Sequence, residues 1–199
     1  MNRIYPLLLV FTLLLSACQH RVNLVVTTQS GQLEGIEIDG VKAYLGIPFA
    51  EAPVGALRWQ APQPKSPWQG VRPAKCFASD PMQCNPFPDM VFRGPDKNED
   101  CLYLNVWTAA RHTSEALPVL IYFNGGGLMC GSGSEPRYDG AAMAREGVVT
   151  VTANYREGIF GYFSHPELSA ESPYQASGNY GFLDQAAALQ GGGDNISAF

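Results

Sequence analysis

The sequence contains no run of basic residues, no C-x-x-C pair and no G-x-S-x-G motif. Without a basic run, and with a formal net charge of −5, nucleic acid is not expected as a partner. Without C-x-x-C spacing, and with His20, His112 and His165 in no ligand pattern, neither a metal site nor another cofactor is expected. No internal repeat or low-complexity tract is present either.

Apolar residues, glycine and proline are abundant instead. Hydrophobic residues make up 46% of the chain and charged residues 16%, a balance typical of folded rather than disordered proteins. The 199 residues are enough for one domain with a sizeable core. The 21 glycines and 15 prolines predict many tight turns and fixed loops.

The first 17 residues are typical of an export signal. Arg3 gives a positive start, and the mostly apolar run 6–15 is too short to span a bilayer as a stable helix. The run ends in Leu15-Ser16-Ala17-Cys18, which resembles a bacterial lipobox, whose cysteine receives a diacylglyceryl group. An ordinary secretory signal with a chance cysteine is the alternative. We expect residues 1–17 to be removed, Cys18 to carry lipid, and residues 18–23 to tether the domain 24–199 to a membrane.

An exported, lipid-anchored protein would lie in the cell envelope. Gln19 after the lipidated cysteine resembles the sorting signal for the bacterial outer membrane. Export would also place the other cysteines in an oxidising compartment, where disulfides persist. These cysteines are Cys76, Cys84, Cys101 and Cys130.

Hydrophobic patterns predict an α/β fold in which a small antiparallel sheet leads into a doubly wound, mostly parallel sheet. Strands at 23–28, 32–38 and 41–45, with Asp39-Gly40 as a hairpin turn, would form the small sheet. Prolines exclude long regular elements from 46–100, so cystine and aromatic packing are expected to fix that segment. The larger sheet would contain strands at 102–108, 118–123 and 148–153, with helices at 138–145 and 179–189. The apolar runs 118–123 and 148–153 are typical of strands buried on both faces.

Asn124-Gly125-Gly126-Gly127 directly follows the predicted strand 118–123. Consecutive glycines let a backbone turn with its N–H groups pointing outward, and such a group of donors can bind a developing oxyanion. A plain tight turn without a catalytic role is the alternative, because glycine-rich turns are common.

Several motifs resemble the type-B carboxylesterases and cholinesterases, and they occur in the order found in that family. The first group is Gly46-Ile47-Pro48-Phe49-Ala50, Pro53-Val54-Gly55 and Leu57-Arg58-Trp59. The second group is the run 99–107 (EDCLYLNVW), Gly125-Gly126-Gly127 and Gly131-Ser132-Gly133-Ser134. The third group is Asn154-Tyr155-Arg156, the run 164–169 (SHPELS) and the run 178–185 (GNYGFLDQ).

The resemblance implies an α/β-hydrolase fold and hydrolysis of a small-molecule carboxylic ester through a serine acyl-enzyme. In that fold the serine lies in a G-x-S-x-G elbow and is followed by the acid and then by histidine. The resemblance ends just before the elbow strand, so no catalytic residue is assigned and the chain is expected to be an inactive N-terminal fragment. His165 precedes the expected position of the serine and is interpreted as a structural loop histidine.

The resemblance also implies roles for particular residues. Gly126 and Gly127 would supply two oxyanion donors. Arg58 would pair with Glu99, and Arg156 with Asp184, as bidentate ion pairs. Cys101 would form a disulfide with an upstream cysteine, either Cys84, which we prefer, or Cys76, whereas Cys130 would be a small buried free thiol.

Two departures from the family pattern concern the site and the last helix. Asn124 stands where many esterases have histidine and cholinesterases have tyrosine. Gly191-Gly192-Gly193 replaces a mid-helix segment that usually contains Trp-Val, and glycine costs about 1 kcal/mol per helical position relative to alanine. The helix is therefore expected to break near Gln190. A non-catalytic adhesion-type relative and a decayed or incompletely read gene product remain alternative interpretations.

Overall fold

The structure is a computed structural model that describes residues 23–84 and 87–199. The expected signal sequence, Cys18 and all of the tether except Asn23 lie outside these residues. Within them, no helix combines the length and the apolar character that a membrane crossing requires.

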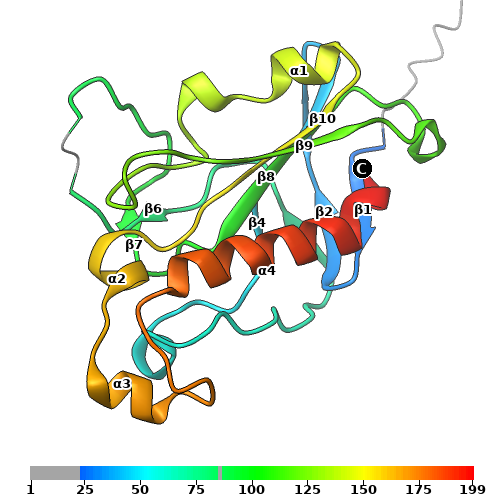
Figure 1. Ribbon diagram of the computed structural model, residues 1–199. Helices are drawn as coiled ribbons and strands as arrows, with labels where there is room; N and C mark the ends of the chain where they lie inside the picture. Colours follow the sequence, from blue (N-terminus) through cyan, green and yellow to red (C-terminus); the bar gives the residue numbers. More distant parts are fainter. Residues whose placement is uncertain (1–22, 85–86) are drawn as a thin grey trace, which may run out of the picture.

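A five-stranded sheet forms the centre of the domain (Figure 1), with the strand order β3, β4, β8, β10, β9. The bounds are β3 (Ile36–Ile38), β4 (Val41–Pro48), β8 (Tyr103–Thr108), β9 (Val119–Phe123) and β10 (Val149–Ala153). β9 and β10 are parallel, whereas the other three neighbouring pairs are antiparallel. The mostly parallel character expected for this sheet is therefore limited, in the described residues, to its β9–β10 end.

A second sheet has three strands, β1 (Val25–Thr28), β2 (Gly31–Glu34) and β5 (Val71–Pro73). The predicted strand 32–38 divides at Gly35, where a Cβ atom would lie 2.7 Å from the Tyr44 ring. Beyond Gly35 the chain enters the larger sheet, so the predicted strand 41–45 belongs there and not to the small sheet. Asp39 and Gly40 form the expected hairpin turn with φ values of 51° and 76°.

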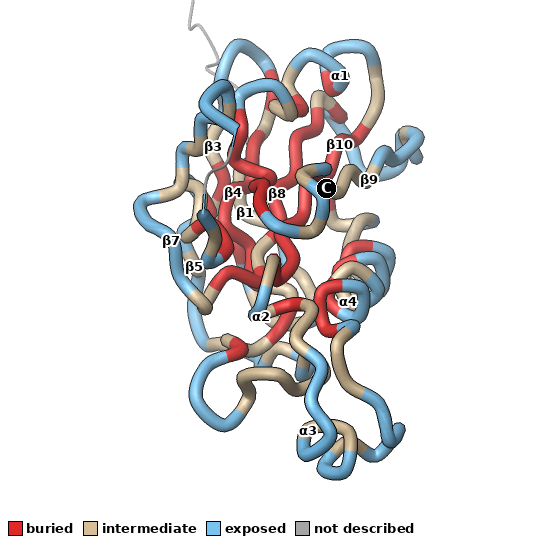
Figure 2. Tube along the Cα trace, turned by 60° about the vertical axis from the view of Figure 1, so that its left-hand side comes forward, coloured by how far each residue is buried: buried red, intermediate tan, exposed pale blue. Residues whose placement is uncertain are grey.

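Helices cover both faces of the five-stranded sheet. Alternate residues of β4 point to opposite sides, so Val41 and Ala43 pack towards α1 (Ala141–Arg145). Tyr44 instead belongs to the main core, with Ala188 of α4 (Tyr180–Asn195). The buried residues gather between these layers (Figure 2). The short helices α2 (Gly158–Tyr162) and α3 (Pro166–Glu171) were not expected from the sequence.

The proline-rich segment contains only short elements after β4, as predicted. These are η1 (Gly55–Leu57), β5, β6 (Asp80–Pro81) and β7 (Lys97–Asn98). Aromatic side chains fix the segment, since Trp59 Nε1 donates to Ile159 O (2.9 Å) and Trp68 Nε1 donates to Gln32 O (2.9 Å). The remaining short elements of the domain are the turns η2 (Thr113–Glu115), η3 (Pro136–Tyr138) and η4 (Ile196–Ala198).

Only one of the two strands predicted to be buried on both faces is buried throughout. All five residues of β10 are buried. Val119 and Leu120 of β9 are 43% and 42% exposed, because β9 lies at the edge of the sheet in the described part of the chain. The apolar run 118–123 therefore predicted the strand correctly, but the expected burial of both its faces is wrong.

The predicted helix break near Gln190 is wrong, because α4 continues through all three glycines to Asn195. Side chains on either side of the glycines support the backbone there. Gln190 Nε2 donates to Asp194 Oδ1 (2.8 Å), and Asn195 Nδ2 donates to Gly191 O (2.8 Å). Asn195 Oδ1 also accepts from Gln29 N (2.7 Å), which ties the end of α4 to the loop after β1.

We predict that Gly193→Ala stabilises the domain by about 1 kcal/mol, because alanine has the higher helix propensity and nothing lies within 4 Å of the added Cβ. The matched control is Gly181→Ala in the same helix, whose Cβ would lie 2.6 Å from Arg156 O. That variant should be destabilised by about 1–3 kcal/mol. Urea denaturation of both variants checks the prediction, and equal effects at the two positions would contradict it.

Candidate oxyanion-binding turn

The glycine turn lies where the parallel strands β9 and β10 end. β9 leads into Asn124-Gly125-Gly126-Gly127, and β10 leads into the loop 154–157. Because parallel strands present their carboxyl ends at one edge of a sheet, the two loops meet there. This is the usual position of a site in open α/β sheets.

The backbone of the turn can be formed only by glycine at two points. Gly126 has φ +139°, and a Cβ atom there would lie 1.9 Å from Cys130 O. Gly131 has φ +140°, and a Cβ atom there would lie 1.9 Å from Asn124 Nδ2. The Asn124 side chain thus occupies the space that the absent Gly131 side chain leaves, and it closes the turn from inside.

Two backbone donors of the turn are available to a ligand. Neither the N–H of Gly126 nor that of Gly127 donates a hydrogen bond to another atom of the described residues. Gly127 is exposed and Gly126 is half-buried, so an anion can reach both groups. The structure therefore places the two predicted donors next to each other on an accessible turn.

The loop after β10 holds the glycine turn at three points. Tyr155 OH donates to Asn124 O (2.7 Å), and Asn124 Nδ2 donates to Glu157 Oε1 (2.9 Å). Further along, Gly158 N donates to Leu128 O (2.7 Å). These contacts fix both the first residue of the turn and the residue after its last glycine.

Glu157 was not predicted as a site residue, and its place in the loop after the buried strand β10 was only a weak signal. Its side chain is buried, and this burial raises the pKa of the carboxyl group to about 7, against the interactions with the side chains of Asn124 and Tyr155, which lower it. Glu157 Oε2 and Asn124 Oδ1 have no hydrogen-bond partner among the described residues. A buried acid thus contacts the first residue of the candidate turn.

A second buried polar group supports the far side of the turn. Asp80 Oδ1 accepts hydrogen bonds from the hydroxyls of Ser132 and Ser134, and Asn154 Oδ1 accepts from Gly133 N (2.8 Å). Gln83 Oε1 accepts from Gly131 N (2.7 Å). The motif that follows the glycine triplet is therefore structural, because its hydroxyls bind the protein and not a ligand.

Both expected ion pairs are formed, and they differ in burial. Arg58 Nε and Nη2 contact Glu99 at 2.5 and 2.6 Å, with 40% and 20% of the two side chains exposed. Arg156 Nε and Nη2 contact Asp184 at 2.8 and 2.7 Å, with only 3% and 0% exposed. The first pair lies near the surface, whereas the second lies in the interior between the loop after β10 and α4.

The expected disulfide is not formed, since all four cysteines of the described residues are free. Cys101 is buried in an apolar cluster with Ala50, and this burial raises the pKa of its thiol. Cys84 and Cys76 are both exposed. Cys101 cannot pair with either of them as placed, because its side chain packs into the interior and theirs lie at the surface. Cys130 is buried and free.

In the part of the chain that the structure describes, the remaining candidate residues form no further site. His165 precedes α3, where its Nδ1 accepts from Glu167 N (3.3 Å), so it caps a short helix. No group of three or more potential metal ligands occurs in ranges 23–84 and 87–199.

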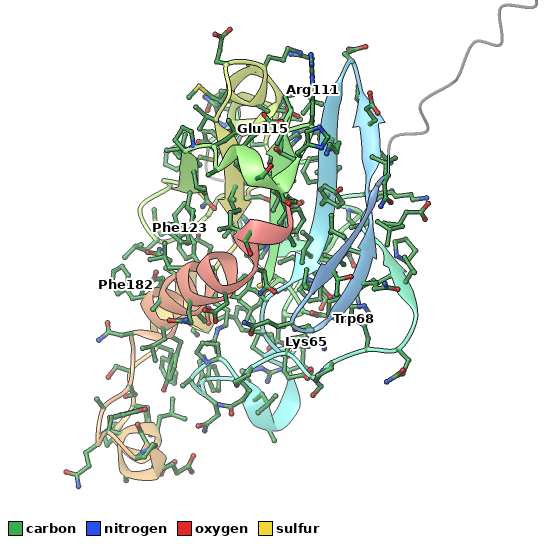
Figure 3. All side chains as sticks on the ribbon, turned by 90° about the vertical axis from the view of Figure 1, so that its right-hand side faces the viewer. Lys65, Trp68, Arg111, Glu115, Phe123 and Phe182 are labelled. Atoms are coloured by element: carbon green, nitrogen blue, oxygen red, sulfur yellow. The ribbon has the colours of Figure 1, made fainter. Side chains whose placement is uncertain are left out.

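A cavity of about 450 Å³ lies between α4 and the sheet. It is lined by Val151, Trp68 and Lys65, and by Gly191 and Gly192 of α4. Figure 3 shows Lys65 and Trp68 beside the strands of the three-stranded sheet. Among the described residues, none of the glycine turn lines this cavity, so it is separate from the candidate site.

Comparison with known proteins gives one family. A model of the carboxylesterase family matches residues 22–199. Fumonisin B1 esterase of Sphingopyxis macrogoltabida is 49% identical over 177 residues, covering 89% of this chain and 32% of that protein. Para-nitrobenzyl esterase of Bacillus subtilis is 43% identical over 178 residues, covering 88% and 35%.

Solved structures agree with these relatives. The Geobacillus stearothermophilus carboxylesterase EST55 has a TM-score of 0.77 and 43% identity, covering 88% of this chain and 35% of that one. A PNB esterase structure has a TM-score of 0.80 and 39% identity, covering 89% and 36%. The chain spans about a third of the length of the relatives that it matches.

We predict that Asp184→Asn destabilises the domain by about 3–5 kcal/mol, because it leaves the buried Arg156 guanidinium without a counter-charge. Glu99→Gln is the matched change in the partly exposed pair, and it should cost clearly less because water can solvate Arg58. Urea denaturation at pH 7 measures both losses. Equal losses would show that burial does not separate the two pairs.

Proposed function

The chain belongs to the carboxylesterase family, and on this premise we propose that it forms the N-terminal part of a serine carboxylic-ester hydrolase. Its sheet, with helices on both faces, is part of an α/β-hydrolase fold. The proposed substrate is a small-molecule carboxylic ester, and the proposed intermediate is a serine acyl-enzyme.

The pair of free N–H groups at Gly126 and Gly127 is the observation that carries this proposal. In acyl transfer, negative charge develops on the carbonyl oxygen, and fixed backbone donors stabilise it without reorganising. The turn is held at both ends by the loop after β10, so its donors are fixed before a substrate arrives.

We further propose that the 199 residues do not hydrolyse esters by themselves. A serine hydroxyl is a poor nucleophile at neutral pH without an adjacent base. The sequence has no G-x-S-x-G elbow, and the buried acid beside the turn, Glu157, is hydrogen-bonded to Asn124 and not to a histidine. An oxyanion hole retains some catalysis after loss of triad residues only in an otherwise intact site.

Lipid attachment at Cys18 is proposed from the sequence alone. The lipobox-like run before Cys18 supports it, and it would anchor the domain to a membrane of the cell envelope, with Gln19 favouring the outer membrane of a two-membrane bacterium.

We predict that the chain, assayed with a short-chain nitrophenyl ester, gives a rate equal to that of the buffer blank, because it lacks the nucleophile and base. The control is a chimera in which the C-terminal part of the para-nitrobenzyl esterase follows Phe199. That chimera should form acyl-enzyme and turn over the ester.

Two outcomes would contradict the proposal. Turnover by the 199 residues that an organophosphate blocks by labelling one of their serines would place the active site elsewhere. A chimera with a cooperative thermal transition and the circular dichroism of the parent, but no turnover, would show that this turn does not serve ester hydrolysis.

We predict that Cys18→Ser abolishes membrane association in a bacterial host, because the sulfur that receives the diacylglyceryl group is absent. Fractionation of the cells, with Cys84→Ser as the matched control, measures the effect. The same distribution of the Cys18→Ser protein and the unchanged chain between membrane and soluble fractions would rule out lipid attachment at Cys18.

A further inference from the structure

Asn124 and Glu157 each keep one buried oxygen without a partner, although their side chains already share a hydrogen bond. Asn124 Nδ2 donates to Glu157 Oε1 at 2.9 Å. Asn124 Oδ1 and Glu157 Oε2, the second oxygen of each group, have no partner among the described residues. Two such acceptors in one contacting pair are unfavourable, because each loses its hydration without replacement.

Protonation of the Glu157 carboxyl group would supply the missing hydrogen bond between these two oxygens. A protonated carboxyl group is both a donor and an acceptor, whereas a carboxylate can only accept. With the proton on Oε2, Glu157 can donate to Asn124 Oδ1 while Oε1 still accepts from Nδ2. Acid and amide then satisfy each other through two hydrogen bonds.

The surroundings of Glu157 also favour the neutral acid. Burial raises the pKa of the thiol and phenol groups that face it, so these groups are uncharged at neutral pH: Cys101, Cys130, Tyr155 and Tyr162. The charged groups that line a small pocket with Glu157 are Arg58, Glu99 and Arg156. Arg58 is paired with Glu99 and Arg156 with Asp184, and no ion pair joins a cation to Glu157 in the described residues.

We propose that Glu157 is a proton-dependent positioning residue of the oxyanion turn, which holds Asn124 in place as the neutral acid and releases it on ionisation. Asn124 fills the turn from inside against Gly131 and therefore sets the path of Gly126 and Gly127. Ionisation sends the proton to solvent and leaves a buried charge with no cation, so the carboxylate turns outward for hydration. This inference rests on the proposed oxyanion role of the turn.

Ionisation of Glu157 lowers the stability of the folded domain. Burial raises the pKa of Glu157 from its ordinary value of 4.5 to about 7, so the folded state keeps a proton that the unfolded chain has lost. The contribution of Glu157 to the stability of the folded domain is fully present below pH 4.5 and is lost as the pH rises through about 7. The urea concentration at the midpoint of unfolding of the 199-residue chain should therefore be lower at pH 8 than at pH 5.

The test follows the turn directly, by NMR of the 199-residue chain with ¹³C-labelled glutamate and ¹⁵N-labelled glycine. We expect the Glu157 carboxyl carbon and the amides of Gly126 and Gly127 to titrate with one midpoint near pH 7. In Glu157→Gln, which keeps both hydrogen bonds without a proton, the two amides should stay at their low-pH positions throughout. The exposed control Glu146→Gln should leave the shared midpoint unchanged.

A second variant keeps the inference testable if Glu157→Gln does not fold. Asn124→Ala removes the link, so the amides of Gly126 and Gly127 should no longer follow the titration of Glu157. A Glu157 midpoint near its ordinary value, or glycine amides that still titrate in Glu157→Gln, would overturn the inference. None of these measurements requires ester turnover, so an inactive chimera would refute the proposed function and leave this result standing.

Discussion

The buried side chain of Arg156 joins three segments that are distant in sequence. Its guanidinium donates two hydrogen bonds to Asp184 of α4, and its Nη2 also donates to Gln60 O (2.9 Å) in the proline-rich segment. Since both charges are buried, moving either one alone would leave an uncompensated charge in the interior. The loop after β10 is therefore fixed relative to the helix and the proline-rich segment, and Tyr155 and Glu157 are fixed with it.

The glycine turn depends on this fixed loop. A segment that needs φ values of +139° and +66° at successive positions has many other conformations when unfolded. Tyr155 and Glu157 select one of them by binding both the carbonyl and the side chain of Asn124. The turn is thus ordered by contacts outside itself, as fixed oxyanion donors require.

Local patterns predicted most strands, because alternation is a property of short segments, and the family resemblance implied both ion pairs. Features that depend on contacts between distant segments could not be predicted from such patterns. The glycines of α4 indicated a break, but contacts at Gln190 and Asn195 continue the helix past them. Likewise, the family resemblance implied that Cys101 pairs with an upstream cysteine, and only its packing with Ala50 and Leu102 shows that it lies in the interior. Glu157 was missed because a charged letter in a sequence does not reveal whether its carboxyl group is buried.

The domain buries two carboxyl groups near the loop after β10, those of Asp184 and Glu157, in two different ways. The charge of Asp184 is balanced by the buried guanidinium of Arg156, which donates two hydrogen bonds to it. Glu157 has no such partner in the described residues, and burial favours its neutral form instead. A counter-ion beside Glu157 would put a permanent ion pair next to the amides that are proposed to bind an oxyanion. A neutral acid fixes Asn124 without adding charge there, at the cost of working only while the proton remains bound.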